Sequence, residues 1–239
     1  MTSPHIPDMN LKRIPSTDYR LGRHVVHDPR SRSYSLLPPT TFIDREQWRS
    51  KKVRVYDPRP NPNQCHGECG GVSKCIQLNA VGNRRKGRVL NMDDAHKIYS
   101  LATTLDPWPG SYPPIDTGTS ALATCKAAQE LGYGGPYWWI FNGADGIIAA
   151  IQKGWTVNCG TNWENNMFYP DPNQRGLVTL GGGNAGGHLW TAIGYDRKFD
   201  EVIGVCWWGE GFREFRISRT DLDILMADDG DAHVQETVG

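Results

Sequence analysis

The sequence lacks any long hydrophobic run, and it has no excess of charge of either sign. In 239 residues the longest apolar stretches, 137–141 and 146–151, fall far short of the roughly 18 residues that a membrane-spanning helix needs. Lys and Arg total 26, as do Asp and Glu, so the excess of basic residues that a general nucleic-acid binder needs is missing. The sequence therefore predicts a soluble protein without a membrane span or a nucleic-acid partner.

We also see no cleavable secretory leader in the sequence. The first seven residues, Met1 to Pro7, have neither a basic start nor an apolar core, so we expect synthesis and first folding in the cytosol. The six cysteines lie between residues 65 and 206 of a chain that is long enough to build its own core. They indicate buried thiols, metal ligands or a nucleophile rather than a disulfide framework.

Charge and proline divide the chain into an arm and a body. Residues 1–60 carry 12 Lys/Arg against 6 Asp/Glu and half of all the prolines, whereas residues 196–239 carry 5 against 11. We expect 1–60 to be an extended basic arm packed on a body of residues 61–239 and attracted to its acidic end. The arginines concerned include Arg20, Arg23, Arg30 and Arg32. Because the arm leads straight into the body, activation by removal of a propeptide is not indicated.

Hydrophobic periodicity in the body changes from helical to strand-like near residue 154. Apolar spacing predicts a helix from Cys69, with Asn91 capping a second helix and Thr119 a third. The expected helices after the first are 92–105, 120–131, 147–154 and 219–227, and the expected strands are 155–158, 188–195, 202–208 and 212–217. We therefore predict an α+β fold in which a mainly helical lobe, 61–153, meets a mainly β lobe, 154–239.

Two sequence patterns suggest ligand binding, but the evidence for each is weak. The glycine run 181–186 matches a dinucleotide fingerprint, but a strand follows it where the fingerprint requires a helix. Cys65, His66, Cys69 and Cys75 offer no second short-spaced ligand pair downstream, which structural zinc requires. The sequence thus predicts neither a nucleotide cofactor nor a metal.

A cysteine at a helix start and a histidine on a strand make a stronger pair. The N-terminus of a helix lowers the pKa of a thiol, so Cys69 is a candidate nucleophile. The Cys69 amide and the Gln64 side chain could bind an oxyanion. His188 opens the strand 188–195 between small residues and could serve as the general acid and base. Taken alone, a buried cysteine or histidine is more often structural, so the combination carries the hypothesis.

Several segments resemble the papain-like cysteine peptidases, in the compact form encoded by bacteriophages of actinobacteria. Residues 63–69, Asn-Gln-Cys-His-Gly-Glu-Cys, resemble the family's Gln-Gly…Gly-Ser-Cys nucleophile segment. Residues 187–195 resemble its Gly-His-Ala…Val-Gly-Tyr histidine strand. The segments 105–110, 118–120, 160–163 and 208–222 look like the connecting and final motifs of the phage group. The resemblance covers most of the chain and implies a two-lobed papain-like fold.

The resemblance implies the same catalytic roles for Gln64, Cys69 and His188. It makes Gly118 and Thr119 the wall along which substrate backbone lies, and it adds Trp208 to the substrate-binding candidates. It implies a peptide or protein substrate, no cofactor and no metal. A phage protein made in the host cytoplasm could also join the virion, with other virion proteins as partners.

The sequence departs from the family in the gap between Gln64 and Cys69, which is one residue shorter than usual, and at three further positions. Glu68 replaces a small residue before the nucleophile, Gly70 replaces an aromatic residue after it, and Cys206 stands where an Asn normally orients the histidine. A thiol is a poor acceptor for an imidazole N–H, so the orienting bond is supplied from elsewhere or absent. Two functions therefore remain open: a thiol peptidase, and a virion (tail) structural protein that keeps the fold with an impaired site.

Overall fold

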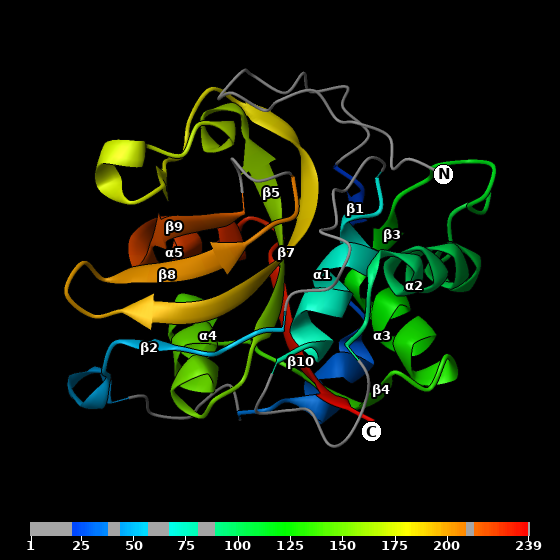
Figure 1. Cartoon of the computed structure of the whole chain (residues 1–239), viewed down its shortest axis with the longest axis horizontal. Coiled ribbons are helices and arrows are strands. Elements are labelled where there is room, and N and C mark those ends of the chain that lie inside the picture. The colour runs from blue at the N-terminus through cyan, green and yellow to red at the C-terminus, as the bar shows by residue number, and fades with distance from the viewer. Residues whose placement is uncertain (1–20, 38–43, 57–66, 81–88, 209–212, 239) are drawn as a thin grey trace.

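The computed structural model is of the α+β class that the sequence predicts, with helices gathered beside a large sheet (Figure 1). It describes residues 21–37, 44–56, 67–80, 89–208 and 213–238. None of the helices within these ranges is long and apolar enough to cross a membrane.

The five α-helices of the described residues fall close to the predicted positions. They are α1 (Cys69–Leu78), α2 (Met92–Leu105), α3 (Ala121–Glu130), α4 (Gly143–Gln152) and α5 (Arg219–Ala227). At α2 the predicted cap is confirmed, because the Asn91 side chain accepts from the Asp94 amide and the Asp94 side chain accepts from the Asn91 amide.

The cap predicted for α3 is wrong by one residue. Ser120, not Thr119, accepts the hydrogen bond from the Ala123 amide, at 3.2 Å. Thr119 lies instead in a two-residue strand, β3 (Thr119–Ser120), which pairs in parallel with β1 (Arg23–His24). Thr119 and Ser120 are adjacent and both carry a hydroxyl that can cap a helix, so the sequence alone does not show which of them is the cap.

The main sheet has eight strands, with β4, β10, β5, β7, β8, β9 and β6 in that order and β2 paired to β7. The strands are β2 (Lys51–Lys52), β4 (Gly134–Trp139), β5 (Val157–Glu164), β6 (Leu177–Val178), β7 (Asn184–Asp196), β8 (Glu201–Val205), β9 (Glu214–Ser218) and β10 (Asp231–Thr237). Strand β7 leaves the glycine run, as expected. The sequence did not predict β4 and β10, whose pairing crosses the expected boundary between the two lobes.

Helix α1 is buried along its whole length. It packs against β7 on one side, where the Thr191 hydroxyl donates to the Ser73 carbonyl at 2.9 Å. On the other side a Cβ at Gly71 would collide with the Ala95 carbonyl of α2, so only glycine allows this approach. Lys74 is also buried, and burial lowers the pKa of its amine, which hydrogen-bonds His233 Nε2 at 2.7 Å.

Two hydrophobic clusters hold the sheet between layers of helices. One joins α4 and α5 to residues such as Trp190 and Phe215, and the other joins α1, α2 and α3 to residues such as Ile193 and Val205. Figure 1 shows α1, α2 and α3 on one side of β7, with β8, β9 and α5 on the other. Strand β7 therefore carries residues of both halves of the core.

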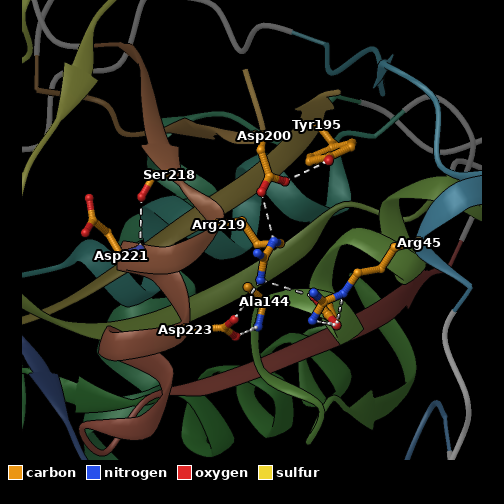
Figure 2. A network of polar contacts seen from close by, with 9 residues as sticks. Arg45, Ala144, Tyr195, Asp200, Ser218, Arg219, Asp221 and Asp223 are labelled. Carbon is orange, nitrogen blue, oxygen red and sulfur yellow. Dashed lines mark hydrogen bonds and ion pairs between the residues drawn. The ribbon is translucent and has the colours of Figure 1, made fainter. Parts of the chain in front are cut away.

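A polar network fixes α5 to α4 and to the turn between β7 and β8 (Figure 2). Arg219 Nε donates to Asp200 Oδ2 at 3.0 Å, and Nη1 donates to Asp223 Oδ2 at 3.2 Å. Asp200 also accepts from the Tyr195 hydroxyl, and Asp223 accepts from the Ala144 amide at the start of α4. Arg219 thus links the two carboxylates that hold these elements.

Arg219→Met should lower the free energy of unfolding by about 1 kcal/mol, because it removes charged hydrogen bonds from a partly buried guanidinium whose carboxylate partners are exposed to solvent. Urea unfolding followed by circular dichroism measures the change. Arg32→Met, at an exposed arm residue, is the control and should leave stability nearly unchanged. Equal midpoints for the two variants would contradict the role given to Arg219.

Candidate active site

Cys69 is the first residue of α1, as the sequence predicts, and its side chain is fully buried. Its Sγ accepts from the Leu189 amide at 3.4 Å and from the amides of Gly22 and Gly70. Ala121 and Trp139 complete an apolar cluster around it. Burial outweighs the three donors and raises the pKa of the Cys69 thiol to about 11. In this structure Cys69 is therefore a protonated thiol at neutral pH, not the thiolate that its helix position predicts.

His188 lies on β7, one residue before the amide that reaches Cys69. Burial lowers the pKa of His188 to about 3, so its imidazole is neutral. Its Nε2 is 3.2 Å from Cys206 Sγ, and its Nδ1 has no hydrogen-bond partner among the described residues. Cys206 thus occupies the position beside the imidazole that its alignment with the family's Asn predicts. The structure brings Cys69, His188 and Cys206 to one buried centre.

Two tryptophans enclose the imidazole. Trp163 meets His188 edge-on, with ring centroids 4.9 Å apart and an interplanar angle of 75°. Trp208, predicted to bind substrate, lies 4.4 Å from the His188 ring and is fully buried. In this structure Trp208 packs on the imidazole and keeps water from it.

The N-terminal arm crosses the site as an extended peptide. The Gly22 amide faces Cys69 Sγ, and the Gly22 carbonyl accepts from the Thr119 amide at 2.7 Å. A Cβ at Gly22 would collide with the Gly67 carbonyl, so glycine is required where the arm passes the nucleophile segment. His24 stacks on Trp108 with ring centroids 4.3 Å apart. The predicted substrate wall is therefore occupied by the chain's own backbone.

Arg23 anchors the arm beside the thiol. Its Nη2 donates to Asp231 Oδ2 at 3.0 Å, and the two side chains are 0% and 5% exposed. Of the arm arginines expected to meet the acidic segment, Arg23 does so, whereas Arg30 pairs with Asp28 within the arm, and Arg20 lies outside the described residues. A buried pair is screened little by salt, so this contact between the arm and the body does not depend on long-range attraction.

Glu68 lies directly before the nucleophile and is fully buried. It forms an ion pair with His96 of α2, with Nδ1 and Oε2 2.5 Å apart, and this bond raises the pKa of His96. The buried carboxylate of Glu68, which replaces the small residue of the family, is thus paired with a histidine on α2. Sequence reasoning missed His96 because it sits on the predicted helix 92–105 with no pattern that links it to Glu68.

The remaining predicted residues divide into two groups. Gly118 donates its amide to the Tyr99 hydroxyl at 2.9 Å, and the Thr119 hydroxyl donates to Asp106 at 2.8 Å, so the wall is held by polar bonds to α2 and its C-terminal cap. Gln64, the predicted oxyanion donor, lies outside the described residues, as does Cys65.

Comparisons with known proteins support the papain-like fold that the sequence motifs imply. No protein-family model matches the chain, and no curated protein matches it. Xylellain, a cysteine protease from Xylella fastidiosa, superposes with a TM-score of 0.65 at 14% identity, covering 95% of this chain and 99% of that one. The fold is that of the papain-like cysteine proteases.

Two further papain-like structures are proforms. Procathepsin B S9 from Trypanosoma congolense gives a TM-score of 0.60 at 13% identity, covering 94% of this chain and 89% of that one. The ragweed pollen cysteine protease Amb a 11 in its proform gives 0.56 at 13% identity, covering 82% and 66%. At these identities the papain-like match shows the fold alone.

His96→Gln should destabilise the protein at acidic pH and matter less at alkaline pH. Because the folded-state pKa of His96 is raised, the stabilisation is fully present below its unfolded value, about 6.5, and is lost as the pH rises through the raised value. We expect a loss of about 1–2 kcal/mol at pH 5.5, reduced from the value for a fully buried pair because His96 is partly exposed.

Urea unfolding at pH 5.5 and pH 9 measures this difference. The control is His27→Gln, because His27 and Asp229 form an exposed pair with side chains 52% and 70% exposed, and it should change little at either pH. An effect of His96→Gln that is the same at both pH values would show that the Glu68 pair does not titrate as described.

Proposed function

We propose that the chain is a thiol peptidase with Cys69 as nucleophile and His188 as general acid and base. The observation that carries this proposal is the peptide main chain across the thiol, with the Gly22 amide at Cys69 Sγ and the Gly22 carbonyl bound to Thr119. A site that holds one extended peptide by its backbone can hold another. The papain-like fold, shared with several cysteine proteases, supports the same chemistry.

The arm would have to leave before the site works. What faces the thiol is the N–H of Gly22, whereas attack needs a carbonyl carbon, so the arm blocks the site without being placed for cleavage. Its departure admits water, which lessens the burial that holds Cys69 and His188 neutral. A proton can then pass from the thiol to the imidazole, which gives the thiolate–imidazolium pair that thiol peptidases use.

The proposed reaction then has two stages. The Cys69 thiolate attacks the scissile carbonyl, and the oxyanion is bound by the Cys69 amide and by Gln64. His188 gives its proton to the leaving amine, and an acyl group remains on sulfur. The neutral His188 next takes a proton from a water molecule while the water oxygen attacks the acyl carbon, and cleavage of the C–S bond releases the acid and restores the thiolate–imidazolium pair. Cys206 contributes the contact to Nε2 that an Asn makes in related peptidases.

The second candidate function is a virion structural protein with an inactive site. The contact between His188 Nε2 and Cys206 Sγ favours it, because sulfur orients an imidazole poorly. We propose a bacteriophage source and synthesis in the host cytoplasm for either function, and virion proteins as partners above all for the structural one, and these proposals rest on the sequence motifs.

Arg23→Ser should make Cys69 reactive by releasing the arm. Wild-type Cys69 should resist brief iodoacetamide exposure at pH 7, whereas the variant should be alkylated at least about tenfold faster because the thiolate fraction rises. Mass spectrometry identifies the labelled cysteine, and the other described thiols serve as internal references. These are Cys75, Cys125, Cys159 and Cys206, all buried. Arg32→Ser is the matched control in the arm.

Equal alkylation of Cys69 in the wild type, the variant and the control would contradict the blocked site. Labelling of all the thiols together in Arg23→Ser would instead indicate loss of the fold.

In the Arg23→Ser background, Cys206→Asn should raise the rate of peptide hydrolysis by roughly tenfold, well below the roughly 10⁴ that orientation is worth in a serine triad. The new carboxamide can accept a hydrogen bond from the imidazole, whereas Cys206→Ala cannot and serves as control. The kcat measured with a fluorogenic peptide gives the result. Equal rates with Asn and Ala would mean that another group orients His188, and no hydrolysis by any variant would favour the structural protein.

A further inference from the structure

A cavity of about 420 Å³ lies between the sheet, α1 and the chain segment that follows β2. This volume falls within the range of small-molecule binding sites. We name it the β2 cavity and define it by the six apolar side chains of its floor, which are Val53, Val55, Ile76, Ile193, Val205 and Trp207. Such a floor can bury the apolar body of a ligand.

Hydrogen bonds fix the wall that the segment after β2 forms. The Val53 amide donates to the Ile193 carbonyl at 2.7 Å, and the Tyr56 amide donates to the Asn79 carbonyl at 3.0 Å. The segment therefore runs from β7 to the C-terminal cap of α1 (Figure 1). Apart from the half-buried Val55, the floor side chains are at most 8% exposed. Because the fold holds its walls, the β2 cavity is formed before any ligand arrives.

The edge of the β2 cavity is basic. Lys52, Arg54 and Arg213 line it together with a single carboxylate, Glu214. Both oxygens of that carboxylate are engaged, because Oε2 accepts from Lys52 and Oε1 accepts from Arg216 at 2.7 Å. Burial acts to raise the pKa of Glu214, but these two bonds outweigh it and lower the pKa. The carboxylate thus stays charged beside its own cations.

Arg54 is the cation that remains for a ligand. Its side chain is exposed, and it forms no ion pair with any residue that the structure describes. Its guanidinium carbon lies 5.8 Å from the centre of the Tyr56 ring. A guanidinium offers several N–H donors in one plane, which suits a carboxylate. An apolar floor with a cation at its edge therefore complements a molecule that has an apolar body and an anionic end.

We propose that the β2 cavity binds small carboxylates with an aliphatic body. The floor buries the aliphatic chain, and Arg54 holds the carboxylate. The floor is mostly branched aliphatic, so most of the affinity comes from burial of the chain. An exposed ion pair is worth at most about fivefold in affinity, and this sets the selectivity for an anion. The inference is independent of the proposed peptidase function, because neither Cys69 nor His188 lines the cavity.

Octanoate and octanamide are suitable probes of the full-length protein, because they share one chain and differ in charge. Titration calorimetry at neutral pH and low salt should show octanoate bound about fivefold more tightly than octanamide. Arg54→Met keeps a long side chain without the charge and should reduce this preference to within about twofold. Arg32→Met, at an exposed arm residue that does not line the cavity, is the matched control and should preserve the preference.

A second variant tests where the probes bind. Val55→Trp places a larger side chain in the β2 cavity from a half-buried position, so both probes should lose at least about tenfold in affinity. Circular dichroism checks that the fold is kept, and Val55→Phe replaces this variant if Val55→Trp does not fold.

Equal affinity for octanoate and octanamide, or no binding of either, would overturn the inference. An equal loss of preference in Arg32→Met and Arg54→Met would mean that general attraction of charge selects the anion, and would also count against it. Binding that survives a larger side chain at Val55 would place the probes elsewhere on the protein and would reject the β2 cavity as their site.

Discussion

Burial of α1 and of the neighbouring part of β7 keeps the central ionisable groups of the site in their neutral forms. All ten residues of the helix are buried between β7 and the other helices of its lobe. Burial favours the neutral form of each group, so it raises the pKa of Cys69 and lowers the pKa values of Lys74 and His188. Charge persists at the edge of this region where a partner is supplied, as in the pairs of Glu68 with His96 and Arg23 with Asp231. Cys69 and His188 are therefore both uncharged while the arm is in place.

Beside the thiol, the arm is held both by its backbone at Gly22 and by the side chain of Arg23. Gly22 contributes only main-chain groups, and its lack of a side chain is a steric requirement. Arg23 supplies the one buried side-chain ion pair between the described part of the arm and the body. The main-chain bond between Gly22 and Thr119 does not depend on which side chain the arm carries there. When a peptide strand adds to the edge of a sheet, its main-chain hydrogen bonds likewise give affinity, whereas its side chains give specificity.

Local features of the sequence could be predicted, and long-range ones could not. The start of α1 at Cys69, the Asn91 cap and the limits of α5 follow from spacing and capping chemistry within a few residues. Strands β4 and β10 escaped prediction because β4 begins with two glycines and a proline, and β10 carries polar residues at positions that the structure buries. Their burial is a property of the assembled sheet.

The catalytic candidates show the same limit. A helix start identified Cys69, and the family motif placed Cys206 beside the imidazole. His188 was expected to open its strand, but β7 begins at Asn184 because the strand extends into the glycine run. The protonated state of the thiol was not foreseen, because it depends on an arm whose path no local pattern reveals. Opposite charge at the two ends of the sequence was the available signal, and it pointed to Arg23 together with three other arginines. Only the fold shows that Asp231 is the partner.

The pairing of Arg23 with Asp231 also implies an order for the last steps of folding during synthesis. A ribosome makes Arg23 more than two hundred residues before Asp231, so the arm has no anchor while most of the chain emerges. Strand β10 lies between β4 and β5. The sheet therefore cannot be completed until β10, which contains Asp231, has been synthesised. Completion of the sheet and attachment of the arm therefore depend on one strand. Until β10 is in place, Arg23 has no partner for its buried ion pair, and once it is in place the arm can cover Cys69.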